Sequence, residues 1–566
     1  MRIQRDVDFW FSTTLYMECS EKQVRALLTQ GISMSVMLEP PTNTDAQESP
    51  EPLPDASVLE DKTPEWCRVS SAVPTFLLVL GMVLIVFANR PLWHSDLWDH
   101  INYGEHILQH HVVSRTEPLV SLAEGMPTVN SAWLAQVSMA FCARTDGLGL
   151  PGLQFLHATL IVISLAAVGY AVTKRSSSAA FGVLSCAIFL AVNWQQFLIV
   201  RPQTVGVTFF SVVLAALATG ATRNRLSWIA LPLIFAVWAN CHGSFAMGLL
   251  LMGLFVVGRV IDVLFRTRSL TKAVRNRKTI RLLLMTQLCA AAALLNPGGL
   301  AIYHEVIRVG SHPNITTMYE WDPLTLRMKQ GQMTAAAAVL LLLALRASPR
   351  RLRATEMLPL LVTGGMALWS GRMLNWFAPV CAVVICVHAA AAWRSMQNIR
   401  RPALLCRRTG LWTVVSLGLC WIFFGFTSLG LQTLHGRTPE LRRVLSRDTP
   451  IEPLEYLSSL DEVPPGVAFM PAEWAGFLTR FGPNELKPMV NLHVHVIPEQ
   501  VWSDYVRLID GPADWDGLLD RYGINFVIAD KLRNARLVEN LRESEDYETQ
   551  YEDAQAAVFA RIKTIH

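Results

Sequence analysis

The chain changes from apolar to charged within the stretch VPTFLLVLGMVLIVFANRPLWHSDLWDH, residues 73–100. Its first half, Val73 to Ala88, approaches the roughly 20 apolar residues with which a helix crosses a bilayer. Its second half, Trp93 to His100, places two aspartates, two histidines and two tryptophans at the end of that run. A carboxylate at a bilayer edge can bind a metal, take a proton from a hydroxyl or position a sugar. The alternative is an aromatic belt with solvated charges.

The composition extends this pattern to most of the chain. Of 566 residues, 52% are hydrophobic and only 17% are charged, whereas soluble proteins carry about 25% charged residues. The sequence therefore predicts a multi-pass helical membrane protein. The net charge of +4 does not indicate a nucleic-acid partner, because the basic residues lie in short loops between spans. Ten cysteines without a CxxC pair predict neither a disulfide framework nor a zinc site.

The apolar runs predict a mainly α fold, a polytopic bundle of about eleven spans. The candidate spans are residues 73–90, 151–173, 178–199, 203–221, 226–240, 243–265, 280–295, 332–347, 356–371, 374–393 and 411–431. Residues 1–72 are expected to be a cytoplasmic, largely disordered tail, since their second half is rich in proline and acid. Residues 73–435 form the transmembrane domain, with a long first outer loop at 90–150. Residues 436–566 are expected to form a small extracytoplasmic α/β domain.

The loops between spans differ in charge from one side to the other. Basic residues follow every even-numbered span, for example in residues 266–281 and 394–408. The positive-inside rule therefore places those loops and the amino terminus in the cytoplasm, and the first loop and the carboxyl terminus outside.

Polar side chains that could take part in catalysis or ligand binding gather at the opposite, outer ends of the spans. This asymmetry predicts a site on the outer face. The candidate residues there are Asp96, Asp99, His100, Arg201, Gln203, Asn240, His242, Glu320, Arg372 and Asn375.

Arg201 and Arg372 break the charge rule because they lie at outer ends of spans, where basic residues are sparse. A charge at that depth needs a partner. The functional alternative is a lipid-linked phosphate, which guanidinium groups bind bidentately. The structural alternatives are an ion pair with Asp96, Asp99 or Glu320, or snorkelling to the headgroups.

The carboxyl-terminal region reads as alternating strands and helices. Strands are predicted at 467–470, 524–529 and 556–560, and helices at 454–460, 498–509 and 535–543. His493 and His495 are expected to alternate on a strand, where surface polarity is favoured over a metal site.

Taken together, the ordered motifs resemble a bacterial family of multi-pass membrane proteins grouped with the GT-C-type glycosyltransferases. The resemblance covers residues 73–566. The motifs that carry it are Asp96-Leu97-Trp98-Asp99-His100, Trp133-Leu134, Arg201-Pro202-Gln203, Trp238 to Gly243, Asn296-Pro297-Gly298-Gly299, Glu320-Trp321, Arg372 and Glu473 to Leu478.

The resemblance implies an inverting enzyme of the bacterial plasma membrane. It would move a sugar from a polyprenyl-phosphate donor to a glycan, lipid or protein acceptor on the extracytoplasmic face. Asp96 would be the catalytic base or a ligand of Mg²⁺ or Mn²⁺, assisted by Asp99 and His100. Many GT-C enzymes carry paired acids in this loop, whereas Ser95 precedes Asp96 here, which leaves metal dependence open.

The other outer-face residues would bind the substrate. Arg201 and Arg372 would bind the donor phosphate, and the remaining parts of the substrate would contact Gln203, Asn240, His242, Glu320 and Asn375. The alternative function is a non-catalytic protein that binds or handles a lipid-linked glycan, or that scaffolds an envelope complex through its carboxyl-terminal region. A transporter is disfavoured, because transport needs polar residues near the bilayer midplane.

Overall fold

The computed structural model describes residues 60–562, except 94, 145–146, 398–407 and 438. Most of the predicted cytoplasmic tail, residues 1–59, lies outside the described residues. The described residues up to the first long helix contain one short 3₁₀ turn, η2 (Glu65–Cys67).

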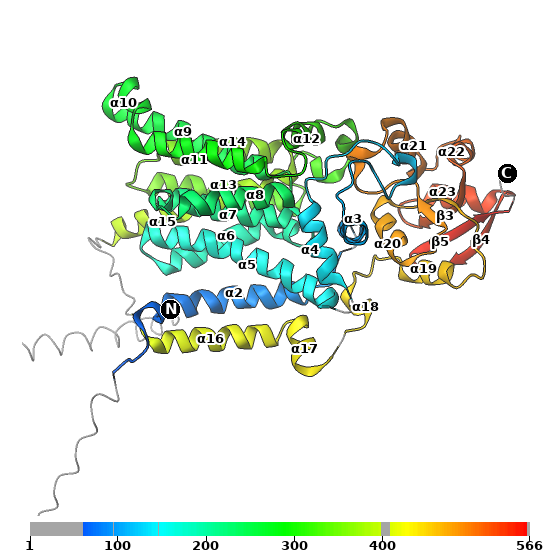
Figure 1. The fold of residues 1–566 in the computed structure, drawn as a ribbon, viewed down its shortest axis with the longest axis horizontal. Helices are drawn as coiled ribbons and strands as arrows, with labels where there is room; N and C mark the ends of the chain where they lie inside the picture. The colour runs from blue at the N-terminus through cyan, green and yellow to red at the C-terminus, as the bar shows by residue number, and fades with distance from the viewer. Residues whose placement is uncertain (1–59, 94, 145–146, 398–407, 438, 563–566) are drawn as a thin grey trace, which may run out of the picture. The chain divides into compact units, whose positions relative to one another are not determined.

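Eleven helices in the described ranges coincide with the eleven predicted apolar segments. They are α2 (Ala72–Ala88), α5 (Gly149–Ser176), α6 (Ala179–Phe197), α7 (Gln203–Thr219), α8 (Ser227–Cys241), α9 (Phe245–Thr267), α11 (Arg277–Ala293), α13 (Lys329–Ala347), α14 (Ala354–Trp369), α15 (Leu374–Met396) and α16 (Gly410–Gly425). They run side by side as one bundle (Figure 1).

The bundle makes the protein a multi-pass helical membrane protein. Within the described residues, five helices are long and apolar enough to cross a membrane. The number becomes six if α16 and α17 (Ser428–His435), which meet at 89°, form one broken span. The remaining apolar helices are shorter, so the count of eleven spans stays a prediction.

Helix α15 lies at the centre of the bundle. In its most apolar stretch, 83% of the residues are buried. The helix packs against α5, α6, α13 and α14. Small residues let neighbouring helices approach closely. At Gly182 of α6, an added Cβ would lie 2.1 Å from Thr173 Oγ1 of α5, so only glycine fits this crossing.

Short helices cover one end of the bundle. The loop between α2 and α5 forms α3 (Leu97–His110), η3 (Ser121–Ala123) and α4 (Trp133–Ala143). A second cover comes from α12 (Ala301–Gly310), η5 (Pro313–Thr317) and η6 (Tyr319–Trp321). The turn η7 (Gly371–Met373) joins α14 to α15. At the other end, η4 (Ala221–Arg223) and α10 (Leu270–Val274) lie in the basic loops.

A five-stranded sheet in the order β2-β1-β3-β5-β4 forms the carboxyl-terminal region. The strands are β1 (Gly466–Phe469), β2 (Leu486–Pro488), β3 (Ile524–Asp530), β4 (Tyr547–Glu552) and β5 (Ala556–Arg561). Strand β1 pairs in parallel with β2 and β3, whereas β5 pairs antiparallel with β3 and β4. The helices are α18 (Leu441–Val444), α19 (Ile451–Ser458), α20 (Ala472–Phe481), α21 (Glu499–Ile509), α22 (Trp515–Arg521) and α23 (Ala535–Glu543).

The three predicted strands and three predicted helices are present here, and β2 and β4 were missed. Strand β2 is only three residues long, and β4 is a polar edge strand with the sequence YETQYE. The strand expected at His493 and His495 is wrong: the segment forms the 3₁₀ turn η8 (Val494–Val496).

Candidate functional site

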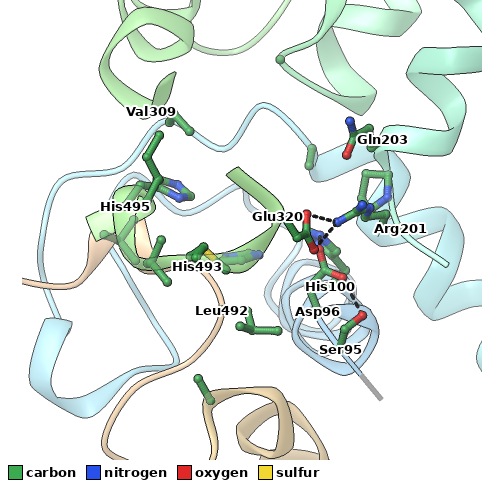
Figure 2. A pocket seen from close by; sticks show the side chains of 18 of the residues that line it. Ser95, Asp96, His100, Arg201, Gln203, Val309, Glu320, Leu492, His493 and His495 are labelled. Carbon is green, nitrogen blue, oxygen red and sulfur yellow. Dashed lines mark hydrogen bonds and ion pairs between the residues drawn. The ribbon is translucent and has the colours of Figure 1, made fainter. Parts of the chain in front are cut away.

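A cavity of about 1030 Å³ opens where the bundle, its covering helices and the carboxyl-terminal region meet. Figure 2 shows part of its lining. Seven of the candidate residues line it, from turns and short helices that are far apart in the sequence: Asp96, His100, Arg201, Gln203, His242, Glu320 and Arg372.

Asp96 stands immediately before α3, and its carboxylate does not cap that helix. The Ser95 hydroxyl donates to Asp96 Oδ1 at 3.1 Å, and His100 Nε2, one helical turn later, lies 3.7 Å from Asp96 Oδ2. Burial alone would raise the pKa of this carboxyl. The contact with His100 and the charges of Arg201 and Arg372 outweigh burial and hold the pKa of Asp96 well below its usual range. Asp96 is therefore an ionised carboxylate.

Arg201 and Arg372 share one carboxylate. Arg201 Nη1 donates to both oxygens of Glu320 at 2.7 Å, and Arg372 Nη1 donates to Glu320 Oε2 at 3.1 Å. Burial raises the pKa of Glu320, but the two arginines lower it more, so the net shift is downward. The structural alternative considered for these arginines, an ion pair with Glu320, is thus present. Arg372 also lies over the Trp321 ring, 5.4 Å from its centroid.

His242 and Gln203 offer uncharged hydrogen-bonding groups beside the arginines. His242 Nδ1 accepts from the Ser244 amide at 3.0 Å, which places the proton of the neutral ring on Nε2. Burial, with the charges of Arg372, His100 and Arg201, lowers the pKa of His242 to about 3, so the ring is neutral. Gln203 Oε1 is buried and has no hydrogen-bond partner among the residues that the structure describes, so it is an unused acceptor.

A row of rings forms the wall opposite the bundle. Tyr103 stacks on His493 with ring centroids 4.4 Å apart and an interplanar angle of 10°. His493 also lies 4.9 Å from His100 and 5.9 Å from His495, centroid to centroid. Burial lowers the pKa of both His493 and His495, the latter to about 4.

Both histidines are therefore neutral cavity residues, and the expectation of surface polarity for them is wrong. Their only signal in the sequence is the apolar setting NLHVHVIP, residues 491–498.

Three of the predicted site residues do not line the cavity. Asp99 Oδ2 accepts from the Leu492 amide at 3.3 Å, and burial raises its pKa well above the usual value. Asn240 Oδ1 accepts from Trp133 Nε1 at 2.6 Å. Asn375 Oδ1 accepts from Asn193 Nδ2 at 2.9 Å. These side chains join helices and loops around the site.

The sequence leaves a bound Mg²⁺ or Mn²⁺ open, with Asp96 as a candidate ligand. Among the described residues, no group of three or more His, Cys, Asp and Glu side chains is placed to hold a metal ion. Two carboxylates that line the cavity, Asp96 and Glu320, both interact with Arg201 and Arg372. Guanidinium groups therefore supply the positive charge that a cation would bring.

No protein family and no curated protein matches the chain by sequence. Among solved structures, the Archaeoglobus fulgidus oligosaccharyltransferase tethered to an acceptor peptide with the NVT sequon matches 86% of this chain and 74% of its own, at 11% identity and a TM-score of 0.50.

Weaker matches include ArnT from Cupriavidus metallidurans bound to undecaprenyl phosphate (14% identity, 86% of this chain, 97% of that chain, TM-score 0.43). Another is the arabinofuranosyltransferase AftD from Mycobacteria (14%, 86% and 40%, TM-score 0.48). The match to the oligosaccharyltransferase confirms the resemblance in fold to the GT-C-type glycosyltransferases.

Proposed function

We propose that the protein is a membrane glycosyltransferase that moves a sugar from a polyprenyl phosphate to an acceptor on the extracytoplasmic face. The observation that carries this proposal is the combination of groups in one cavity. An ionised carboxylate, Asp96, shares the cavity with two guanidinium groups, Arg201 and Arg372, at the end of the bundle away from the basic loops.

The donor end of the site lies at the arginines. Arg201 stands between α6 and α7, and Arg372 stands between α14 and α15. At these helix ends a phosphate reaches the guanidinium groups while its lipid tail lies along the bundle, and guanidinium binds phosphate through paired hydrogen bonds. His242 Nε2 as a donor and Gln203 Oε1 as an acceptor are available for the sugar hydroxyls.

The chemistry is one displacement at the anomeric carbon, which inverts its configuration. The acceptor oxygen forms the new bond, the bond to the phosphate oxygen breaks, and Asp96 takes the acceptor proton. The arginines stabilise the charge of the leaving phosphate. His100, 3.7 Å from Asp96, orients the carboxylate. The uncharged rings of Tyr103, His493 and His495 form the acceptor side.

The test measures turnover of radiolabelled polyprenyl-phosphate sugars by purified protein in lipid nanodiscs. Because a general base contributes about 10²–10⁴ in rate, Asp96→Asn is expected to lower kcat by that factor while the protein stays folded. Arg372→Ala is expected to raise KM for the donor. Glu305→Gln is the matched control, because Glu305 also lines the cavity but pairs with Arg308 at 2.7 Å.

Full activity of Asp96→Asn would contradict the assignment. Donor binding without turnover in every variant, wild type included, would favour the non-catalytic alternative, a protein that binds a lipid-linked glycan.

A further inference from the structure

The two cavity arginines already hold an anion supplied by the protein itself. The Glu320 carboxylate accepts three hydrogen bonds from Arg201 and Arg372, between 2.7 and 3.1 Å. A carboxylate bridging two guanidinium groups has the geometry in which guanidinium groups also bind a phosphate. The place of a bound phosphate oxygen is thus filled by a side chain.

The charges of the cluster sum to zero without a ligand. Arg201 and Arg372 contribute two positive charges, and Asp96 and Glu320 contribute two negative charges, because the pKa of each carboxyl lies below its ordinary value. The side chain of Arg201 is only 3% exposed. A phosphodiester entering this site would add an uncompensated negative charge beside the buried guanidinium group of Arg201, which is unfavourable.

We propose that Glu320 is an internal occupant of the donor-phosphate site and that the phosphodiester of the donor takes its place on the two arginines. Exchange of one monoanion for another keeps the cluster neutral. This inference deepens the proposed function, because it takes the anion to be the phosphate of a lipid-linked sugar. It also predicts the donor class: a single phosphodiester balances the charge, whereas a diphosphate leaves an excess of negative charge.

The exchange needs only a rotation of the Glu320 side chain. The backbone around it is held: the Trp321 amide donates to Met318 O at 2.9 Å, and the Gly371 amide donates to Asp322 O at 3.0 Å. The side chain itself is 27% exposed and faces the cavity. The carboxylate can therefore leave the arginines for the cavity without movement of η6 or η7.

The experiment measures binding of methyl farnesyl phosphate, a lipid phosphodiester, to the full-length protein in nanodiscs by calorimetry. Glu320→Gln removes the competing charge, so its Kd is expected to fall by about tenfold or more. Glu320→Asp, whose shorter side chain reaches the arginines less well, is expected to give a smaller fall. Glu305→Gln, which alters a carboxylate paired elsewhere, is expected to leave Kd unchanged. Arg372→Ala is expected to cancel the gain of Glu320→Gln.

An unchanged or raised Kd in Glu320→Gln would overturn the proposal, because it would make Glu320 a fixed support of the arginines. Tighter binding of farnesyl diphosphate than of methyl farnesyl phosphate to Glu320→Gln would overturn the donor class. Sugar transfer is not measured in this assay. The replacement of Glu320 by the phosphodiester can therefore be confirmed even if sugar transfer is not detected. It can also be ruled out even if sugar transfer is detected.

Discussion

Two aspartates three residues apart have opposite electrostatic settings. Asp96 faces the arginines, and the pKa of its carboxyl is held well below the usual value. Asp99 is buried against the Leu492 amide, and burial, opposed by that hydrogen bond and reinforced by the charge of Asp96, raises its pKa well above 3.8. The same short stretch therefore holds one carboxyl whose pKa is lowered beside the arginines and one whose pKa is raised by burial.

Asp99→Asn is expected to flatten the pH dependence of stability. An acid whose pKa is raised on folding contributes stability that is fully present below its unfolded pKa, 3.8 here, and that is lost as pH rises toward the folded pKa. The wild type should thus lose apparent melting temperature between about pH 4 and the raised pKa, and the amide variant should lose less. Thermal unfolding of the purified protein across this range measures the difference.

Glu117 titrates in both proteins and does not disturb this comparison. The pKa of Glu117 is also raised by burial, and it is present in the wild type and in the variant. Equal slopes of melting temperature against pH in the two proteins would show that Asp99 is ionised in the folded state. Retained sugar transfer in Asp99→Asn, beside its loss in Asp96→Asn, would separate the packing role from the catalytic one.

At the scale of elements, the contact of α20 with α3 holds the carboxyl-terminal region in place beside the cavity. Asn102 Nδ2 of α3 donates to Gly476 O of α20 at 2.8 Å. Trp98 lies 5.4 Å from Phe477 and 5.1 Å from Phe481 between ring centroids. This contact brings the carboxyl-terminal region against the loop that contains α3.

Gly476→Ala is expected to weaken this contact. The added Cβ would lie 2.6 Å from both the amide nitrogen and Oδ1 of Asp99, and overpacking of this kind costs about 1–3 kcal/mol. The matched control is Gly517→Ala in α22. Apart from the neighbouring backbone of its own helix, no described atom lies within 4 Å of the added Cβ, and alanine favours the helix by about 1 kcal/mol. Thermal unfolding should therefore shift in opposite directions, and equal shifts would argue against a tight α20–α3 contact.

At the scale of the whole molecule, hydrophobic periodicity and charge predict the helices and the grouping of the loops. Contacts between segments far apart in the sequence determine the rest of the site. Long apolar runs marked the helices of the bundle to within a few residues. The positive-inside rule grouped the loops of Arg201 and Arg372 on one predicted face of the membrane, and these residues share one cavity. No such rule reaches His493, because the segment around it meets α3 through a hydrogen bond between residues 393 positions apart.

The sequence also could not predict which side chains form ion pairs or hydrogen bonds with each other. Arg201 and Arg372 could have met a ligand, a headgroup or a carboxylate, and only the structure places Glu320 between them. Asp99 accepts a hydrogen bond from the Leu492 amide, which lies in the same segment as His493, far from Asp99 in the sequence.

The two ends of the molecule also predict its orientation. Helix α10 lies in a basic loop at one end of the bundle, and the sheet lies at the other end (Figure 1). Residues of α3 and of the carboxyl-terminal region line the cavity, so it opens at the end with the sheet. Excess Lys and Arg favours the cytoplasm, so Leu532→Cys, at a side chain 90% exposed beyond β3, should react with a membrane-impermeant maleimide in intact cells. Lys272→Cys on α10 should react only after permeabilisation.

The wild type, which retains its native cysteines, gives the background of this labelling. The opposite pattern would place the cavity in the cytoplasm. Because the site opens at the end of the bundle that carries the sheet, donor and acceptor would then have to be cytoplasmic as well. Labelling thus decides which membrane face supplies the sugar before either substrate is identified.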